Sequence, residues 1–444
     1  MEFDIVVHNG TIVTMNPDAE IIDNGVICIK EGKLEKIYEQ VDDSGLPQAV
    51  EAVDAGGGIV MPGLVNAHTH LPMTLFRGLA DDLPLQVWLN EHIFPAEAKH
   101  VNPESARIGS LLGCAEAILS GTTTCCDGYF YEDSVALAVR QAGLRAILGH
   151  GVIDFPAPGV PDPGENVQHA LAYTEKWKGA VSTITPSIFC HSPYTCAEAT
   201  LRKAKETANS FGVLFQIHVA ETTTEIDRSQ AEQRMTPVQY LDRIGVLDKN
   251  TLLVHAVWVD DNDTEIIAES NATVAHCPES NMKLASGIAP IPAFIAAGVK
   301  VGLGSDGCAS NNNLDLFQEM DFTAKLHKVK HLDPTVMDAP TVLRMATIEG
   351  AKAIGLDREI GSLEIGKQAD LIIIDTNSPH LTPMYNPISH IVYAAQGPDV
   401  RDVIVAGRWI MRDRRLLTLD LGDLLEKVNA LSQSIKEQKI HNPN

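Results

Sequence analysis

Short apolar runs alternate with stretches of helical texture from about residue 62 to residue 360, and this alternation restricts the fold more than any other feature of the chain. A strand followed by a helix and then by another strand predicts a parallel β–α unit. Candidate strands lie at 144–149, 183–189, 213–219, 251–255, 272–276 and 299–304, and candidate helices include 104–119 and 197–209. These units are numerous enough to close an α/β barrel of the (β/α)8 TIM type.

At both ends of the chain the sequence pattern is typical of β-strands, without the intervening helices. Short runs in the first sixty residues are separated by turn signals such as Asn9-Gly10, and strand texture returns after Gly366. We therefore expect a small β-sandwich domain built from both termini. Apolar residues at helical spacing over 421–437 predict an amphipathic helix packed on the body. The expected divisions are residues 1–61 and 366–420 for the β domain, 62–365 for the barrel and 421–444 for the helical tail.

Acidic residues outnumber basic ones, 58 to 34, which gives a net charge of −24. A field of this sign repels nucleic-acid phosphates and anionic lipid surfaces, so we expect neither nucleic acid nor membrane as a partner. A neutral or cationic small substrate is favoured, and a nucleoside, which carries no phosphate, is compatible. We see no signal peptide, no apolar stretch of about 18 residues and no C-x-x-C pair among eight cysteines, which predicts a cytoplasmic protein with reduced thiols.

The sequence His68-Thr69-His70 follows an apolar run and is the clearest local signal for chemistry. Residues two apart on a strand face the same way, so both imidazoles can reach one metal ion. In a parallel barrel, functional residues gather at the C-terminal ends of the strands. Three later strand ends carry further candidates, which are His218 with Glu221 close behind it, then His255, then Asp306. Each alone fits a core or turn residue, but together they predict a metal centre.

Imidazole nitrogens with a carboxylate and no thiolate suit zinc, with iron, manganese or cobalt as substitutes. A two-metal site would want a bridging ligand, such as a modified lysine, from a middle strand. The strand at 183–189 contains no lysine, which favours one ion. A single ion with an open position lowers the pKa of bound water to about 7, so the reaction class is hydrolytic attack on an electrophilic carbon.

The chain resembles the amidohydrolase superfamily, in the branch that holds cytosine, guanine and adenosine-type deaminases. The superfamily resemblance rests on residues 62–89, 218–222 (HVAET), 276–287 (HCPESNMKLASG), 302–315 (GLGSDGCASNNNLD) and 361–375 (GSLEIGKQADLIIID). Within the branch, the chain is most similar to the 5-methylthioadenosine/S-adenosylhomocysteine deaminase family. Residues 88–101 (WLNEHIFPAEAKHV) and 191–196 (HSPYTC) carry that narrower resemblance.

The resemblance implies a role for each candidate residue. Zinc would be held by His68, His70, His218 and Asp306. Asp306 and His255 would take the proton of the attacking water, with His255 orienting it, and Glu221 would protonate the ring nitrogen beside the attacked carbon. Substrate contacts would come from Glu97 to the ribose and from His191, with Trp88 and Ser310 lining the pocket, while His276 would be structural. The implied reaction is deamination at the six-position carbon of adenine, by an enzyme expected to be a homo-oligomer.

Several alternatives stay open at the level of sequence. The substrate could be methylthioadenosine, S-adenosylhomocysteine or adenosine, and either His150 or Arg145 could contact its tail, where members of the family can carry an arginine. A guanine or other aminopurine or pyrimidine deaminase and a triazine hydrolase use similar chemistry. A catalytically silent scaffold is the alternative from another class, although the candidate ligands and acid are all present.

Overall fold

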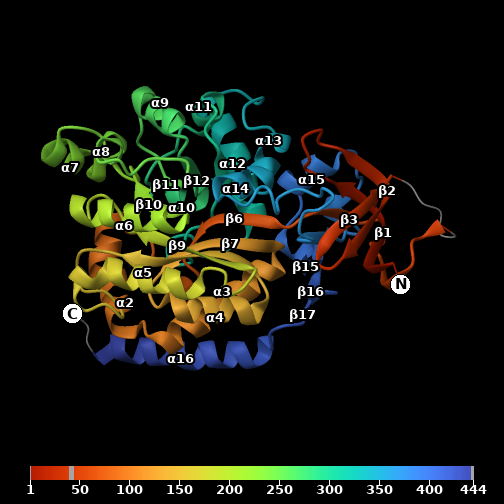
Figure 1. Cartoon of the computed structure of the whole chain (residues 1–444), viewed down its shortest axis with the longest axis horizontal. Helices are drawn as coiled ribbons and strands as arrows, with labels where there is room; N and C mark the ends of the chain where they lie inside the picture. Colours follow the sequence, from red (N-terminus) through yellow and green to blue (C-terminus); the bar gives the residue numbers. More distant parts are fainter. Residues whose placement is uncertain (1, 40–44, 442–444) are drawn as a thin grey trace.

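The computed structural model describes residues 2–39 and 45–441, so the last residues of the predicted tail, 442–444, lie outside the described residues (Figure 1). Eight parallel strands follow one another in chain order around a barrel. They are β6 (Leu64–Thr69), β7 (Thr122–Tyr129), β8 (Arg145–Val152), β9 (Ile184–Cys190), β10 (Phe215–Val219), β11 (Thr251–His255), β12 (Thr273–His276) and β13 (Val301–Leu303). The predicted barrel is therefore confirmed, and the ends of the predicted strands differ from the observed ones by a few residues.

The ring closes where the last strand meets the first. Asp306, in the loop that follows β13, forms a parallel bridge with Thr69. Its amide donates a hydrogen bond of 3.0 Å to the carbonyl of His68. Small and branched side chains of the strands, such as Val65, Ala67 and Val254, form a buried cluster with Ala351 and Ala353 from a helix that follows the last strand.

Helices cover the outside of the barrel (Figure 1). They are α3 (Pro103–Leu119), α4 (Glu132–Ala142), α5 (Asn166–Trp177), α6 (Glu198–Phe211), α7 (Thr223–Gln233), α8 (Pro237–Arg243), α9 (Asp261–Ser270), α10 (Pro278–Lys283), α11 (Ile291–Ala296), α12 (Leu316–His331), α13 (Ala339–Met345) and α14 (Ile348–Ala353). Helix α3 begins at Asn102, whose side chain accepts from the amide of Ser105 in a capping box. Helix α6 buries Leu201, Ala204 and Ala208 at helical spacing and ends at Gly212, with φ of 61°.

A second sheet contains strands from both ends of the chain, which confirms the predicted two-ended β domain. Its members are β1 (Phe3–Val13), β2 (Ile21–Lys30), β3 (Lys33–Tyr38), β4 (Ala49–Asp54), β5 (Ile59–Pro62), β14 (Leu371–Ile374), β15 (Val400–Val405), β16 (Arg408–Arg412) and β17 (Arg415–Leu416). Strand β5 pairs with β14, which joins the N-terminal strands to the C-terminal ones. The sheet curls over a shared core that includes Ile5, Ile29 and Ile373. We propose that the divisions at 61/62, 365/366 and 420/421 mark the units of the fold.

The prediction of a turn at Asn9-Gly10 is wrong, because β1 runs through both residues. Asn9 has a left-handed φ of 58°, and the pairing with β2 shifts register on each side of Gly10. A β-bulge therefore bends the strand without ending it. The first half of β1 pairs with β4 and the second half with β5, so the bulge lets one strand serve two neighbours.

The predicted tail helix is observed as α16 (Leu421–His441), which lies along α3 on the outside of the barrel (Figure 1). Leu424 packs into the main core, and Ile435 joins an apolar cluster with Trp88 and Leu89. The tail thereby contacts the segment that covers the barrel mouth. Among the described helices, none has both the length and the apolar composition needed to cross a bilayer.

Candidate active site

Four side chains gather at the C-terminal rim of the barrel, as the sequence predicted. His68 and His70 come from β6 and its end, His218 from β10, and Asp306 from the loop after β13. Their ligand atoms all lie within 4.8 Å of one another. Nε2 of His68 is 3.2 Å from Nε2 of His218, while Oδ1 of Asp306 lies 3.5 Å from Nε2 of His68 and 3.3 Å from Nε2 of His70.

The arrangement of these atoms fits a metal ion. When both rings carry their proton on Nδ1, the facing Nε2 atoms of His68 and His218 can each offer a lone pair to one cation. Nδ1 of His70 lies 2.6 Å from the carbonyl oxygen of Gly128, which fixes the proton on Nδ1 and frees Nε2 to bind the ion. Three nitrogens and one carboxylate oxygen form a donor set typical of zinc and of other first-row metals.

Two hydroxyl groups hold the fourth ligand in place. Ser280 on α10 donates to Oδ2 of Asp306 at 2.7 Å, and Ser310 donates to the same oxygen at 2.8 Å. The other oxygen, Oδ1, is left to face the histidines. Burial opposes the charge of Asp306, but the hydrogen bonds with His68 and His70 hold the pKa of this carboxyl well below its usual range. Asp306 is therefore ionised and suited to bind a cation.

Strand-end backbones are strained at this rim. Ala220, His255 and Asp306 have φ of 50°, 74° and 59°, in the left-handed region that residues with a side chain rarely adopt. Such conformations cost free energy and persist where the surrounding structure fixes them. Here they turn the chain at the ends of β10, β11 and β13 into the mouth of the barrel.

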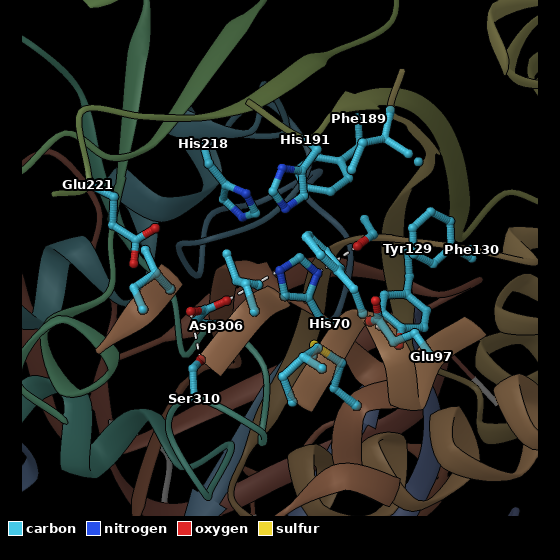
Figure 2. A pocket seen from close by; sticks show the side chains of 18 of the residues that line it. His70, Glu97, Tyr129, Phe130, Phe189, His191, His218, Glu221, Asp306 and Ser310 are labelled. Carbon is cyan, nitrogen blue, oxygen red and sulfur yellow. Dashed lines mark hydrogen bonds and ion pairs between the residues drawn. The ribbon is translucent and has the colours of Figure 1, made fainter. Parts of the chain in front are cut away.

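A cavity opens above the ligand cluster. It is covered by α1 (Leu85–Val87), by the π-helical turn η3 (Trp88–Ile93) and by α2 (Phe94–His100). The sequence-predicted residues that line it are His70, Trp88, Glu97, His191, His218, Glu221, His255, Asp306 and Ser310. His68 is fully buried beneath them. Figure 2 shows Glu221 on one side of the cluster and Glu97 with Tyr129 on the other.

Glu221 and His255 form one side of the site. Nε2 of His255 lies 3.8 Å from Oε2 of Glu221, and Nδ1 of His255 lies 3.0 Å from the side-chain amide of Asn281. Burial, followed by the charge of Asp306, raises the pKa of Glu221 to about 8, so this carboxyl is protonated at neutral pH. Burial also lowers the pKa of His255 to about 4, which keeps its imidazole neutral.

Glu97 lies on the opposite side, on the covering helix α2. Its Oε1 accepts a hydrogen bond of 2.5 Å from the hydroxyl of Tyr129, at the end of β7. Burial raises the pKa of Glu97 to about 7, although the hydrogen bond from Tyr129 opposes this shift. Because Tyr129 takes one oxygen, the second carboxyl oxygen of Glu97 is left for a ligand in the cavity.

His191 follows β9 and lies close to the ligand cluster, with its ring centroid 5.3 Å from that of His218. Nδ1 of His191 is 3.0 Å from the hydroxyl of Thr195, and burial lowers its pKa to about 3. Its Nε2 side is therefore neutral and can contact a substrate. Trp88 donates its indole hydrogen to the carbonyl of Ala80 at 3.1 Å, so its ring serves as an apolar wall.

Three other residues that the sequence offered as candidates lie away from the cavity. His276 is buried with its Nε2 3.4 Å from Nε2 of His327, outside the cavity lining. Arg145 forms a buried ion pair of 2.7 Å with Asp370, which ties the barrel to the β domain. His150 stacks on His169 on the outer side of β8. Neither Arg145 nor His150 is among the residues that line the cavity.

The structure also adds residues that the sequence did not suggest. Tyr129, Ser280, Asn281 and Glu225 each hold a predicted site residue in place. Tyr129 ends a strand, so the barrel rule that found His218 also applied to it. The other three follow strand ends by several residues, and only the folded loops bring them to their partners.

The chain matches the family model described as "Amidohydrolase family" over residues 59–410 and belongs to that family. It is 46% identical to a 5-methylthioadenosine/S-adenosylhomocysteine deaminase of Syntrophobacter fumaroxidans over 98% of each chain. A 5'-deoxyadenosine deaminase of Methanosarcina acetivorans is 44% identical, over 97% of this chain and 98% of the relative. A solved structure of an adenosine deaminase from Xanthomonas campestris, with bound zinc, superposes with a TM-score of 0.95 at 36% identity, over 98% and 99% of the two chains. The chain is thus a metal-dependent hydrolytic deaminase.

Proposed function

We propose that this enzyme deaminates adenosine-type nucleosides, with zinc as its metal, and that 5-methylthioadenosine, S-adenosylhomocysteine and adenosine are the candidate substrates. The observation that carries the proposal is the order of groups along one cavity. Glu221 faces the ligand cluster from one side, and the Glu97–Tyr129 pair lies on the other (Figure 2). That order suits a nucleobase at the metal with its sugar beneath the covering helix.

His68, His70, His218 and Asp306 would hold the ion, and the zinc named for the Xanthomonas campestris structure supports that choice of metal. A zinc ion bound in such a site lowers the pKa of water towards neutrality and so supplies the nucleophile. Asp306 is ionised and held by two hydroxyl groups, so its free oxygen can accept the proton of the attacking water.

His255 orients that water. With the amide nitrogen of Asn281 donating to Nδ1, the neutral ring carries its proton on Nε2, which faces the site beside Glu221. Glu221 then gives its own proton to the ring nitrogen beside the attacked carbon, for which its raised pKa keeps it loaded at neutral pH. Asp306 would pass the proton of the water to the amino group as its bond to carbon breaks, and the loss of ammonia would leave an inosine-type product.

Glu97 binds the ribose hydroxyls through the carboxyl oxygen that Tyr129 leaves free. His191 contacts the substrate through its neutral ring, while Trp88 and Ser310 complete the pocket wall. A free base or a triazine has no sugar for the Glu97–Tyr129 pair to bind. This pair therefore favours a nucleoside over the alternatives, a guanine or other aminopurine deaminase and a triazine hydrolase.

Ammonia release tests the proposal directly. The purified enzyme, with and without added zinc, is assayed on methylthioadenosine, S-adenosylhomocysteine, adenosine, guanine and a chlorotriazine. We expect at least one adenosine to be the fastest substrate and zinc to sustain its turnover. Guanine or triazine turnover about a hundredfold above every adenosine would overturn the proposal, because the pocket would then prefer a ring that carries no ribose.

The oligomeric state, the location and the partners of the enzyme complete the proposal. We infer a homo-oligomer in the cytoplasm that binds neither nucleic acid nor membrane. The net charge of −24 supports the absence of anionic partners, and eight cysteines that are all buried and free support a reducing compartment. Light scattering of the purified chain gives its mass, and a monomer would contradict the oligomer.

A further inference from the structure

The part of the cavity beyond Glu97 has an apolar wall. Phe94 comes from the covering helix, Phe130 follows β7, and Val152 and Ile153 follow one another at the end of β8. Figure 2 shows Phe130 next to Tyr129 and Glu97, on the side of the ligand cluster away from Glu221. A sugar bound by Glu97 would therefore direct its 5′ substituent against this wall.

The carboxyl groups of Glu97, Glu221 and Asp306 line the cavity, and of these Asp306 is ionised while Glu221 is protonated at neutral pH. Among the residues whose side chains the structure describes, no lysine or arginine lines the cavity. The nearest basic candidate on β8, Arg145, is committed to Asp370 at the other end of its strand. A carboxylate brought to this wall would find no counter-ion and would face a protein of net charge −24.

We propose that the cavity selects adenosines whose 5′ substituent is neutral and apolar, such as hydrogen or an alkylthio group, and rejects those whose substituent ends in a charged amino-acid group. The proposal rests on the proposed function and narrows its substrate class. Burial of a thioether against aromatic rings makes a favourable contribution to the free energy of binding. A carboxylate and an ammonium group lose their hydration there without a compensating partner.

The wild-type enzyme provides the first test. The kcat/KM is measured for 5′-deoxyadenosine, methylthioadenosine, S-adenosylhomocysteine and 5′-deoxy-5′-pentylthioadenosine, which is a neutral control of comparable length. We expect the pentylthio compound to remain near methylthioadenosine and S-adenosylhomocysteine to fall at least about tenfold below it, a modest loss for an unpartnered charge. A smaller gap between those two long substrates, whether both react well or both react poorly, overturns the proposal.

These measurements distinguish a failure of the proposed function from a failure of the proposed selection for neutral 5′ groups. If none of the four adenosines releases ammonia while guanine or a triazine does, the proposed function fails, because the selection concerns only adenosines. If the adenosines react but show no dependence on charge, the proposed function stands and the selection fails.

A matched pair of variants tests the wall itself. Phe130 is partly exposed, so Phe130→Arg can be accommodated there more easily than at the fully buried Val152. We expect Phe130→Arg to raise the ratio of S-adenosylhomocysteine to methylthioadenosine turnover by about tenfold at low salt, with the gain falling as salt screens the new charge. Phe130→Met, which is long and neutral, should leave the ratio near the wild-type value. An unchanged ratio in a folded Phe130→Arg enzyme contradicts the placement of the 5′ group, and the wild-type comparison decides if that variant fails to fold.

Discussion

Glu225 holds the backbone of Glu221: its carboxylate accepts the amide hydrogen of Glu221 at 3.0 Å, and that of Ala220 at 2.9 Å. These two amides form the turn after β10, where Ala220 adopts a left-handed conformation. Glu225 is buried in the first turn of α7 and does not line the cavity. Under the proposed function, Glu225 would act on the reaction by positioning Glu221.

Replacement of Glu225 should reduce turnover without removing the metal. In Glu225→Ala the turn loses both acceptors, Glu221 shifts, and we expect kcat to fall by about ten- to a hundredfold, as misplacement by about 1 Å typically costs. Glu225→Gln keeps one acceptor oxygen and should retain most of the activity. Comparable kcat values for the two variants, with equal metal content, would show that Glu225 is merely structural.

The acid itself can be tested by Glu221→Gln. The amide cannot donate a proton to the ring nitrogen as a carboxylic acid does, so kcat should fall by about two to four orders of magnitude. Metal content should stay at the wild-type level, because Glu221 is not among the four clustered ligands. Near-normal turnover of this variant would remove Glu221 from its assigned role.

Turnover should also depend on pH through Glu221. The pKa of this carboxyl is raised to about 8, and the reaction needs its protonated form, so kcat should be lost as the pH rises through about 8. The test is a pH profile of kcat for the wild type and for Glu221→Gln. The alkaline loss should be absent from the residual activity of the variant, and its persistence there would assign it to another group.

The sugar contact is tested at Glu97. Glu97→Ala should raise KM for nucleosides more than it lowers kcat, because the proposal places this residue at the sugar and not at the reacting carbon. Tyr129→Phe removes the hydroxyl that orders Glu97 and should raise KM by a smaller, several-fold amount. An unchanged KM for ribosides in Glu97→Ala would contradict the ribose contact.

Removal of the metal should affect stability as well as activity. Chelation should abolish turnover, and readdition of zinc should restore it. The ion binds the folded chain, so at a free concentration about 100 times its Kd it adds about 2.7 kcal/mol to the free energy of unfolding. Thermal unfolding with and without the chelator measures the shift, and identical Tm values would argue against a resident ion.

The sequence predicted the barrel and the strand ends that meet at its rim from local rules, and the resemblance to the family then selected the four ligands among the candidates there. Alternation of strands and helices sets the architecture, and His68, His218 and Asp306 are recognisable where their strands end. The groups that support them were not predictable in the same way. Ser280 reaches Asp306 only after α10 folds back over the rim. The bulge at Gly10 also escaped prediction, since an Asn-Gly pair is equally compatible with a turn, and only the two partner strands of β1 decide between them.

The bridge between Thr69 and Asp306 has a consequence for how the enzyme is made. The ligand cluster takes residues from the first, fifth and eighth strands of the ring. A nascent chain cannot complete the cluster until Asp306 has left the ribosome, and a fragment that ends before this residue lacks one ligand. An ion bound by all four residues would therefore link the first, fifth and eighth strands and hold the closed ring together.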